Sequence, residues 1–188
     1  MDYCSEKKFS KSDFLIQPIS RGEYENCQFD HCDFSNQDLS DCKFIDCVFS
    51  DCNLSLVNLK NTALQNVQFI DSKLSGVQFD TCNPFALAVS FKKCIIQHAT
   101  FFQLRLNKTV FEQSDLTGSD FSAADLTAAV LDHCNLAQVI FERTILDKAN
   151  LTTAYHFLID PAVNSINKTR FSLDGLPGLL SRYNIVID

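Results

Sequence analysis

The sequence predicts an all-β solenoid in which the chain turns a corner at every fifth residue, and three observations support this. Large apolar residues recur with a period of five over most of the 188 residues. A small residue precedes most of them by two positions, and the remaining three positions of each repeat are mostly polar. The chain also contains 17 Phe but only 5 Gly and 4 Pro, which is unusual for a globular enzyme and indicates repetition.

The large residues, here called the repeat centres, form two runs that differ by a shift of two residues. Of the 25 centres, 23 are Phe or Leu. The first run is Tyr24, Phe29, Phe34, Leu39, Phe44, Phe49, Leu54, Leu59, Leu64, Phe69, Leu74 and Phe79. The second run is Phe91, Ile96, Phe101, Leu106, Phe111, Leu116, Phe121, Leu126, Leu131, Leu136, Phe141, Leu146 and Leu151.

A strict period of five fits neither a helix nor a plain strand. A helix with 3.6 residues per turn would distribute the centres around its circumference. A strand would direct successive centres to opposite faces, because five is an odd number. We therefore expect a bend at every repeat, with stacked coils whose backbones pair at a spacing of about 4.8 Å.

This pattern resembles the pentapeptide-repeat family, whose repeat is a small residue, Asp or Asn, Leu or Phe, and two polar residues. Residues 32–36 (Cys-Asp-Phe-Ser-Asn) and 124–128 (Ala-Asp-Leu-Thr-Ala) are examples, and the resemblance covers residues 24–151. It implies a right-handed quadrilateral β-helix. With about 20 residues per coil, aromatic ladders should fill the core. The expected ladders are Phe29, Phe49 and Phe69 on one wall and Phe101, Phe121 and Phe141 on another.

Three segments are expected. Residues 1–23 form an N-terminal cap, residues 24–154 the solenoid, and residues 155–188 a C-terminal cap or dimerisation module. The register slips within residues 80–90, because twelve residues separate Phe79 from Phe91 and Pro84 falls at a centre position. A structural jog is the favoured interpretation of this insert, and a functional loop is the alternative.

The C-terminal segment predicts a short helix within residues 172–183, with Ser172 as its N-cap, followed by a short strand over residues 184–188. This ending resembles the module through which quinolone-resistance pentapeptide proteins form head-to-head dimers. The resemblance implies a homodimer, with an intramolecular cap as the alternative. The interface candidates are Leu176, Leu179, Leu180, Tyr183, Ile185 and Ile187.

No motif for catalysis, cofactor binding or metal binding is recognised, so the chain is not expected to be an enzyme. Nine cysteines could indicate a secreted disulfide scaffold, but without a signal peptide reduced thiols are favoured. A metal site is the other interpretation of Cys27, Cys32, Cys42, Cys47 and Cys52, but all five occupy the inward small position. They should fill the core, with no volume left for a tetrahedral ion. The sequence lacks a signal peptide and an apolar run of roughly 20 residues, which favours a cytoplasmic protein without a membrane span.

Charge indicates the kind of partner. The net charge is −7, and the balance is −6 over residues 24–54, +4 over 55–108 and −5 over 109–151. An acidic rod repels nucleic acid and attracts the basic grooves that hold it. The resemblance implies a DNA mimic that binds a type II topoisomerase, either DNA gyrase or topoisomerase IV, and protects it from quinolones or a natural toxin. The alternative is a scaffold for another protein partner. The surface candidates are Asp41, Asp46, Asp51, Glu112, Asp115, Asp120, Asp125 and Asp132.

Overall fold

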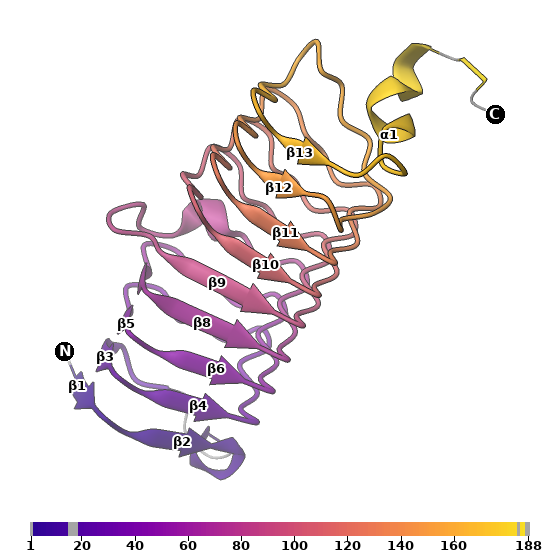
Figure 1. Cartoon of the computed structure of the whole chain (residues 1–188). Coiled ribbons are helices and arrows are strands. Elements are labelled where there is room, and N and C mark those ends of the chain that lie inside the picture. The colour runs from indigo at the N-terminus through magenta and orange to yellow at the C-terminus, as the bar shows by residue number, and fades with distance from the viewer. Residues whose placement is uncertain (1, 15–18, 184, 187–188) are drawn as a thin grey trace.

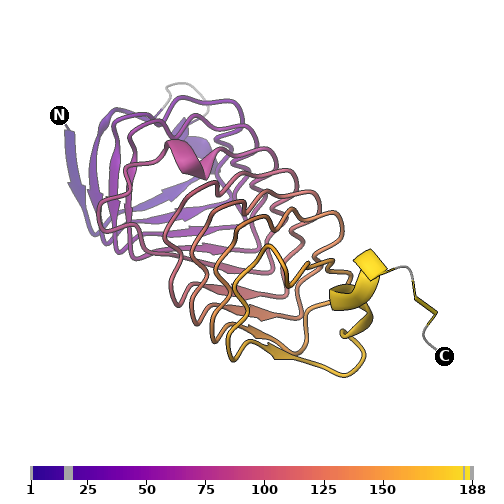
Figure 2. The same cartoon turned by 90° about the horizontal axis from the view of Figure 1, so that it is seen from above.

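The computed structural model describes residues 2–14, 19–183, 185 and 186. The chain forms a right-handed, all-parallel β-solenoid of about eight turns (Figure 1). Seen from above, the coils stack into an elongated rod with four walls, and the chain passes from the first wall to the fourth in each coil (Figure 2). In the part of the chain that the structure describes, no helix is long and apolar enough to cross a bilayer.

Two walls contain regular strands. The first wall begins as a four-stranded sheet in the order β1-β3-β5-β7, and the second wall is a nine-stranded sheet in the order β13-β12-β11-β10-β9-β8-β6-β4-β2. The first sheet consists of β1 (Asp2–Ser5), β3 (Gly22–Glu25), β5 (Lys43–Ile45) and β7 (Ala63–Gln65). The second consists of β2 (Lys8–Ser10), β4 (Gln28–Asp30), β6 (Val48–Ser50), β8 (Val67–Ile70), β9 (Val89–Lys92), β10 (Val110–Glu112), β11 (Val130–Asp132), β12 (Asn150–Leu151) and β13 (Arg170–Phe171).

The other two walls are ladders of isolated parallel bridges. The third wall carries the ladder 33-53-73-95-115-135-155, and the fourth carries 38-58 and 78-100-120-140. The first wall continues above its sheet as the ladder 105-125-145-165. On the second wall, Phe29 pairs with Phe49 and Phe49 with Phe69, so four repeats complete one coil and each repeat forms one wall.

The repeat centres point inward and form aromatic ladders. On the second wall, the Phe29 and Phe49 rings stack at 4.5 Å, and those of Phe49 and Phe69 at 5.3 Å. On the fourth wall, Phe121 stacks on Phe101 at 4.6 Å and on Phe141 at 5.8 Å. Rings on neighbouring walls meet edge to face, a geometry that the aromatic quadrupole favours. The axis of the coil is therefore filled by side chains.

The small residue two positions before each centre also points inward, and many of these residues carry a hydrogen-bond donor. Thr62 Oγ1 donates to the Leu39 carbonyl at 2.7 Å, and Ser119 Oγ donates to the Ile96 carbonyl at 2.6 Å. Cys47 Sγ donates to the Tyr24 carbonyl at 3.2 Å. Small size gives the backbone room to bend, and the donor satisfies a buried carbonyl of the coil below.

Nearly every corner places a residue other than glycine at positive φ, as in Asp46 (51°), Asn66 (54°) and Lys108 (63°). This left-handed conformation is tolerated best by Asn and Asp and disfavours bulky or β-branched residues. It persists because the corner N–H donates to the next coil, for example from Asp46 N to the Gln65 carbonyl at 2.9 Å.

The register slip lies between η2 (Phe79–Thr81) and β9. Across it, Phe69 pairs with Phe91, whereas one coil earlier Phe49 pairs with Phe69, so the coil that contains the slip is two residues longer. The excess is accommodated on the first wall, where residues 84–87 project outward and Phe85 is 77% exposed. Leu104, a bulky residue at a small position, is buried beside this loop and lines a pocket of about 390 Å³ with it.

Both ends extend the coil beyond the expected limits. Residues 2–10 already pair with the next coil through β1 and β2, and β13 pairs with β12 beyond residue 154. The segment expected as an N-terminal cap therefore follows the path of a coil.

The helix at the C-terminus is shorter than predicted. Only α1 (Pro177–Leu180) is helical, followed by the 3-10 turn η3 (Ser181–Tyr183). Ser172 is not its N-cap, because Leu176 occupies that position and the Ser172 hydroxyl accepts the Gly175 N–H at 3.1 Å instead. Pro177 explains the late start, since it suits the first helical position but not the interior. The predicted final strand is absent at Ile185 and Val186, while residues 184, 187 and 188 lie outside the described part.

Candidate interaction surface

The eight acidic candidates do not share one surface. Because successive repeats lie on successive walls, carboxylates five residues apart point in different directions. Asp115 lies on the third wall, Asp120 on the fourth and Asp125 on the first. Glu112 and Asp132 are register partners on the second wall. The other three, Asp41, Asp46 and Asp51, occupy three successive corners. The surface candidates are therefore distributed around the rod and along it.

Two of these carboxylates accept hydrogen bonds from a threonine of their own repeat. Asp115 accepts the N–H and hydroxyl of Thr117 at 3.1 and 2.5 Å and the Gln97 amide at 2.6 Å. Partial burial opposes ionisation of Asp115, but these donors outweigh it and lower its pKa. Asp125 and Thr127 repeat the arrangement at 2.9 and 2.6 Å. Both side chains hold their corners in shape.

Most of the other candidates have a partner in a neighbouring coil. Asn61 donates to Asp41 at 2.8 Å, and Asn66 donates to Asp46 at 2.6 Å. Lys92 pairs with Glu112 at 2.9 Å. Thr153 donates to Asp132 at 2.7 Å. These contacts stabilise the stack of coils, and Lys92 compensates the charge of Glu112.

The fourth wall carries the most coherent negative charge. Its carboxylates, here called the acidic wall, are Asp38, Asp80, Asp120 and Glu142. Lys60 directly flanks a centre of this wall, and two arginines pair with its carboxylates: Arg21 with Asp38 at 2.8 Å and Arg143 with Glu142 at 3.8 Å. Burial raises the pKa of Asp80, and the negative charge of Asp120 acts in the same direction. The Ser40 hydroxyl and N–H, together with Arg21 at 2.8 Å, lower the pKa of Asp38 to about 2.

Only Asp120 of the acidic wall was among the sequence candidates. Asp38 and Asp80 could have been found by counting along the chain one coil at a time and adding two positions at the slip. Asp38 and Asp120, for example, are separated by four coils together with the two extra residues of the slip.

Comparison with family models reproduces this repeat structure. Residues 23–85 match the model described as a pentapeptide repeat region, and residues 94–131 and 124–154 match pentapeptide repeats (8 copies). The chain belongs to the pentapeptide-repeat family. No curated protein matches its sequence.

Solved structures of pentapeptide-repeat proteins are similar in fold. A trypsin-treated form of QnrB1, a plasmid-mediated fluoroquinolone resistance protein, aligns with a TM-score of 0.66 and 17% identity over 99% of this chain and 97% of that one. Full-length QnrB1 gives 0.41 and 18%, covering 97% of each chain. A protein of the Arabidopsis thaliana thylakoid lumen gives 0.39 and 26%, covering 54% of this chain and 60% of that one. Of these three alignments, the first has a TM-score high enough to support a shared fold.

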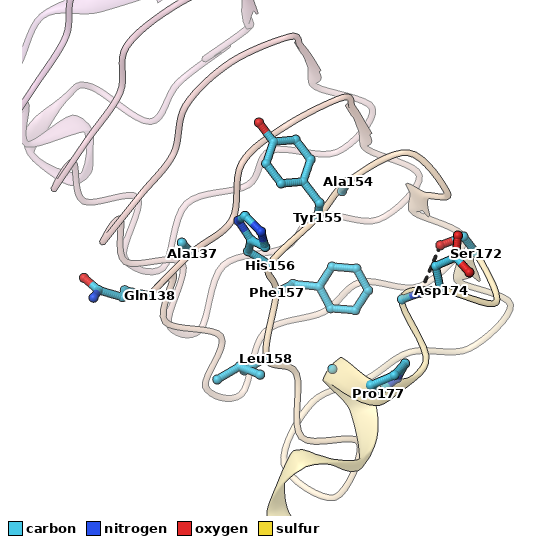
Figure 3. Close-up of a pocket in the computed structure, with 12 residues that line it drawn as sticks. Ala137, Gln138, Ala154, Tyr155, His156, Phe157, Leu158, Ser172, Asp174 and Pro177 are labelled. Atoms are coloured by element: carbon cyan, nitrogen blue, oxygen red, sulfur yellow. Dashed lines mark hydrogen bonds between the residues drawn. The ribbon is translucent and has the colours of Figure 1, made fainter. Parts of the chain in front are cut away.

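The C-terminal module of this pentapeptide-repeat protein packs on the last coil. Ile159 N donates to the Gly178 carbonyl at 3.0 Å, and Arg182 pairs with Asp160 at 2.5 Å. A side chain at Gly178 would collide with the Phe157 backbone. Between the coil and α1 lies a pocket of about 520 Å³, into whose rim Tyr155 and His156 project (Figure 3).

The dimer candidates differ in exposure. Leu176, Leu180, Tyr183 and Ile185 are exposed, whereas Leu179 is partly buried against the core. Ile187 lies outside the described residues. Leu173 and Val186 are more exposed than any of the candidates, so the apolar surface at this end is wider than the sequence indicated.

The nine cysteines, all within the described part of the chain, are not disulfide-bonded, and eight of them are buried. Burial raises the pKa of Cys47, Cys82 and Cys134 to about 12. A thiol that does not ionise is a poor nucleophile and a poor metal ligand.

Proposed function

We propose that this protein is a non-catalytic, DNA-like rod that binds the DNA-binding groove of a type II topoisomerase, such as gyrase or topoisomerase IV, and protects the enzyme from a quinolone or a natural toxin. The supporting observation is the acidic wall on an elongated, internally filled rod. A rod with negative charge along one side resembles a duplex to a basic groove, and its fixed charges need no reorganisation on binding. The fold shared with QnrB1 over nearly the full length directs the choice of partner.

A supercoiling assay with purified gyrase, with and without a fluoroquinolone, tests the proposal. The protein should restore supercoiling in the presence of the drug at micromolar concentration. Asp80→Asn, Asp120→Asn and Glu142→Gln combined should abolish this effect, because they remove three charges from the acidic wall and leave the core unchanged.

The matched control removes three charges elsewhere. Glu6 and Asp71 are exposed corner residues at positive φ, a conformation that Asn adopts at positions 26, 36, 61 and 66, and Asp174 is an exposed residue near the C-terminus. Their triple Asn variant should retain protection. If neither the protein nor the control affects gyrase or topoisomerase IV, the alternative of a scaffold for another partner stands.

We further propose that the C-terminal apolar surface forms a homodimer. Leu180 and Tyr183 are 37% and 58% exposed, although α1 is fixed to the coil by Gly178 and the Arg182–Asp160 pair. An exposed apolar surface that is rigidly held is typical of a protein–protein interface. Leu180→Glu with Tyr183→Glu should halve the mass measured by light scattering. Leu56→Glu, an equally apolar exposed site far along the chain, should leave the mass unchanged.

A further inference from the structure

One corner of the N-terminal half gathers three side chains that can bind a metal ion. Among the residues that the structure describes, Asp30, His31 and Asp51 form a group whose ligand atoms all lie within 4.8 Å of one another. His31 Nδ1 is 2.9 Å from the Asp30 carboxylate. Asp30 ends β4, His31 forms the corner, and Asp51 is the equivalent corner residue of the next coil.

The backbone fixes the spacing of this group. Asp30 is the register partner of Ser50, and His31 N donates to the Ser50 carbonyl at 3.0 Å. The two corners therefore stay one coil apart, while the side chains are exposed and free to rotate. A tetrahedral ion with ligand distances of about 2.0–2.2 Å needs its ligand atoms roughly 3–4 Å apart, which small rotations provide.

Other corner carboxylates in the same coils are arranged differently. At Asp41 and Asp46, the residue of the next coil is an Asn whose amide donates to the carboxylate at 2.8 and 2.6 Å. At His31, the next corner residue is instead Asp51, followed one coil later by Asp71. No Lys or Arg nitrogen of the described residues pairs with Asp30 or Asp51. At the neighbouring corners the carboxylate is bonded to an Asn amide. At this corner a second carboxylate takes the place of the amide, so the group can bind a cation.

A second corner on the same edge of the rod provides an internal comparison. Asp132 and His133 repeat the Asp30-His31 dipeptide, with Nδ1 at 3.0 Å from the carboxylate. The equivalent residue of the next coil is Thr153, whose hydroxyl donates to Asp132 at 2.7 Å. The Asp-His contact is thus present at both corners, but the second carboxylate ligand is present only at the first.

We propose that Asp30, His31 and Asp51 bind a divalent transition-metal ion, with zinc as the best fit. One imidazole and two carboxylates suit zinc, and water completes the tetrahedron. The linear sequence shows no metal motif here, because the ligands come from two successive coils and a full coil of chain separates His31 from Asp51. The site is independent of the acidic wall and of the C-terminal surface.

Calorimetric titration of the full chain with zinc chloride tests this. The protein carries no affinity tag, and Cys4, the one half-buried thiol, is changed to Ser. One equivalent should bind. His31→Asn and Asp51→Asn should each weaken binding at least about tenfold, the loss seen when even the hydrogen-bonding partners of ligands are removed. Both variants should fold, because Asn already occupies this corner conformation elsewhere in the chain.

His133→Asn is the matched control and should bind zinc as the parent protein does. In proton NMR, zinc should shift the imidazole signals of His31 and leave those of His133 unchanged. Equal affinity in the parent, His31→Asn and Asp51→Asn would overturn the proposal. So would an equal loss in His133→Asn, because it would show that an Asp-His pair alone is sufficient.

Discussion

At the scale of single residues, the fold depends on one large and one small inward side chain per repeat. Where the large residues are Phe they stack ring on ring, and Phe121 contacts Phe101 and Phe141 in the coils on either side as well as Phe111 on a neighbouring wall. Removing one ring leaves a cavity that the stacked backbone cannot close, because coil spacing is fixed by hydrogen bonds.

Phe121→Ala should therefore destabilise the protein by about 3–5 kcal/mol in urea unfolding, the cost typical of a large cavity. Phe102→Ala is the control, since Phe102 is 39% exposed and lies on the outside of the same wall. It should cost less than about 1 kcal/mol. Equal losses in the two variants would contradict the stacked core.

The buried thiols should resist alkylation. With the pKa of Cys47 and Cys134 raised to about 12 by burial, little thiolate forms at pH 8, and the reagent has no access. Mass spectrometry after iodoacetamide treatment should show one adduct, on Cys4, in the native protein and nine in denaturant. Rapid modification of a second native thiol would show that a coil opens.

At the scale of elements, the coils differ most at the slip and at the C-terminal module. α1 is only one turn long, so its own hydrogen bonds cannot keep it folded. It is held by close contact between Gly178 and Phe157 and by the Arg182–Asp160 pair. The module is therefore a docked element whose order depends on that contact.

Gly178→Ala should detach the module, because the new methyl group would collide with the Phe157 backbone. Hydrogen exchange should then lose protection over residues 172–183 while the coils stay protected. Leu173→Ala, at a residue 85% exposed, should change nothing. Full protection in Gly178→Ala would show that another contact holds the module.

At the scale of the whole molecule, the period of five predicted a chain that bends at every repeat and the residues that point inward. The four-sided coil, and with it the residues that stack in each ladder, followed from the family resemblance. The period alone did not predict which acidic residues lie on the same wall. Asp115, Asp120 and Asp125 are neighbours in the repeat but lie on three walls, whereas Asp80 and Asp120 share one. The partners of surface residues come from other coils, so a linear pattern shows them only when the coil length and the slip are both known. The short helix escaped prediction because docking, not amphipathic spacing, determines its extent.

Acid should destabilise the whole rod. The pKa values of Asp33, Asp38, Asp115, Asp125, Asp132, Asp147 and Asp160 are lowered in the folded state. A carboxylate whose pKa is lower in the folded state stabilises the fold at pH values above its unfolded-state pKa. This contribution is lost as the pH falls through the folded-state pKa, which is about 2 for Asp38. The free energy of unfolding should stay level from pH 7 to about 5 and fall between about pH 4 and 2. Asp38→Asn should reduce this loss of unfolding free energy. A parent protein whose unfolding free energy does not change between about pH 4 and 2 would contradict the prediction.

The projecting residues 84–87 show how this architecture accepts additional chain. Two extra residues leave the pairing of β8 with β9 intact and loop outward in the coil that stacks on β7. The same opening should admit a foreign peptide, such as an epitope or a protease site, between Phe85 and Ala86 without disturbing the rest of the rod. The protein thus has a site that should tolerate peptide insertion near the middle of its sequence.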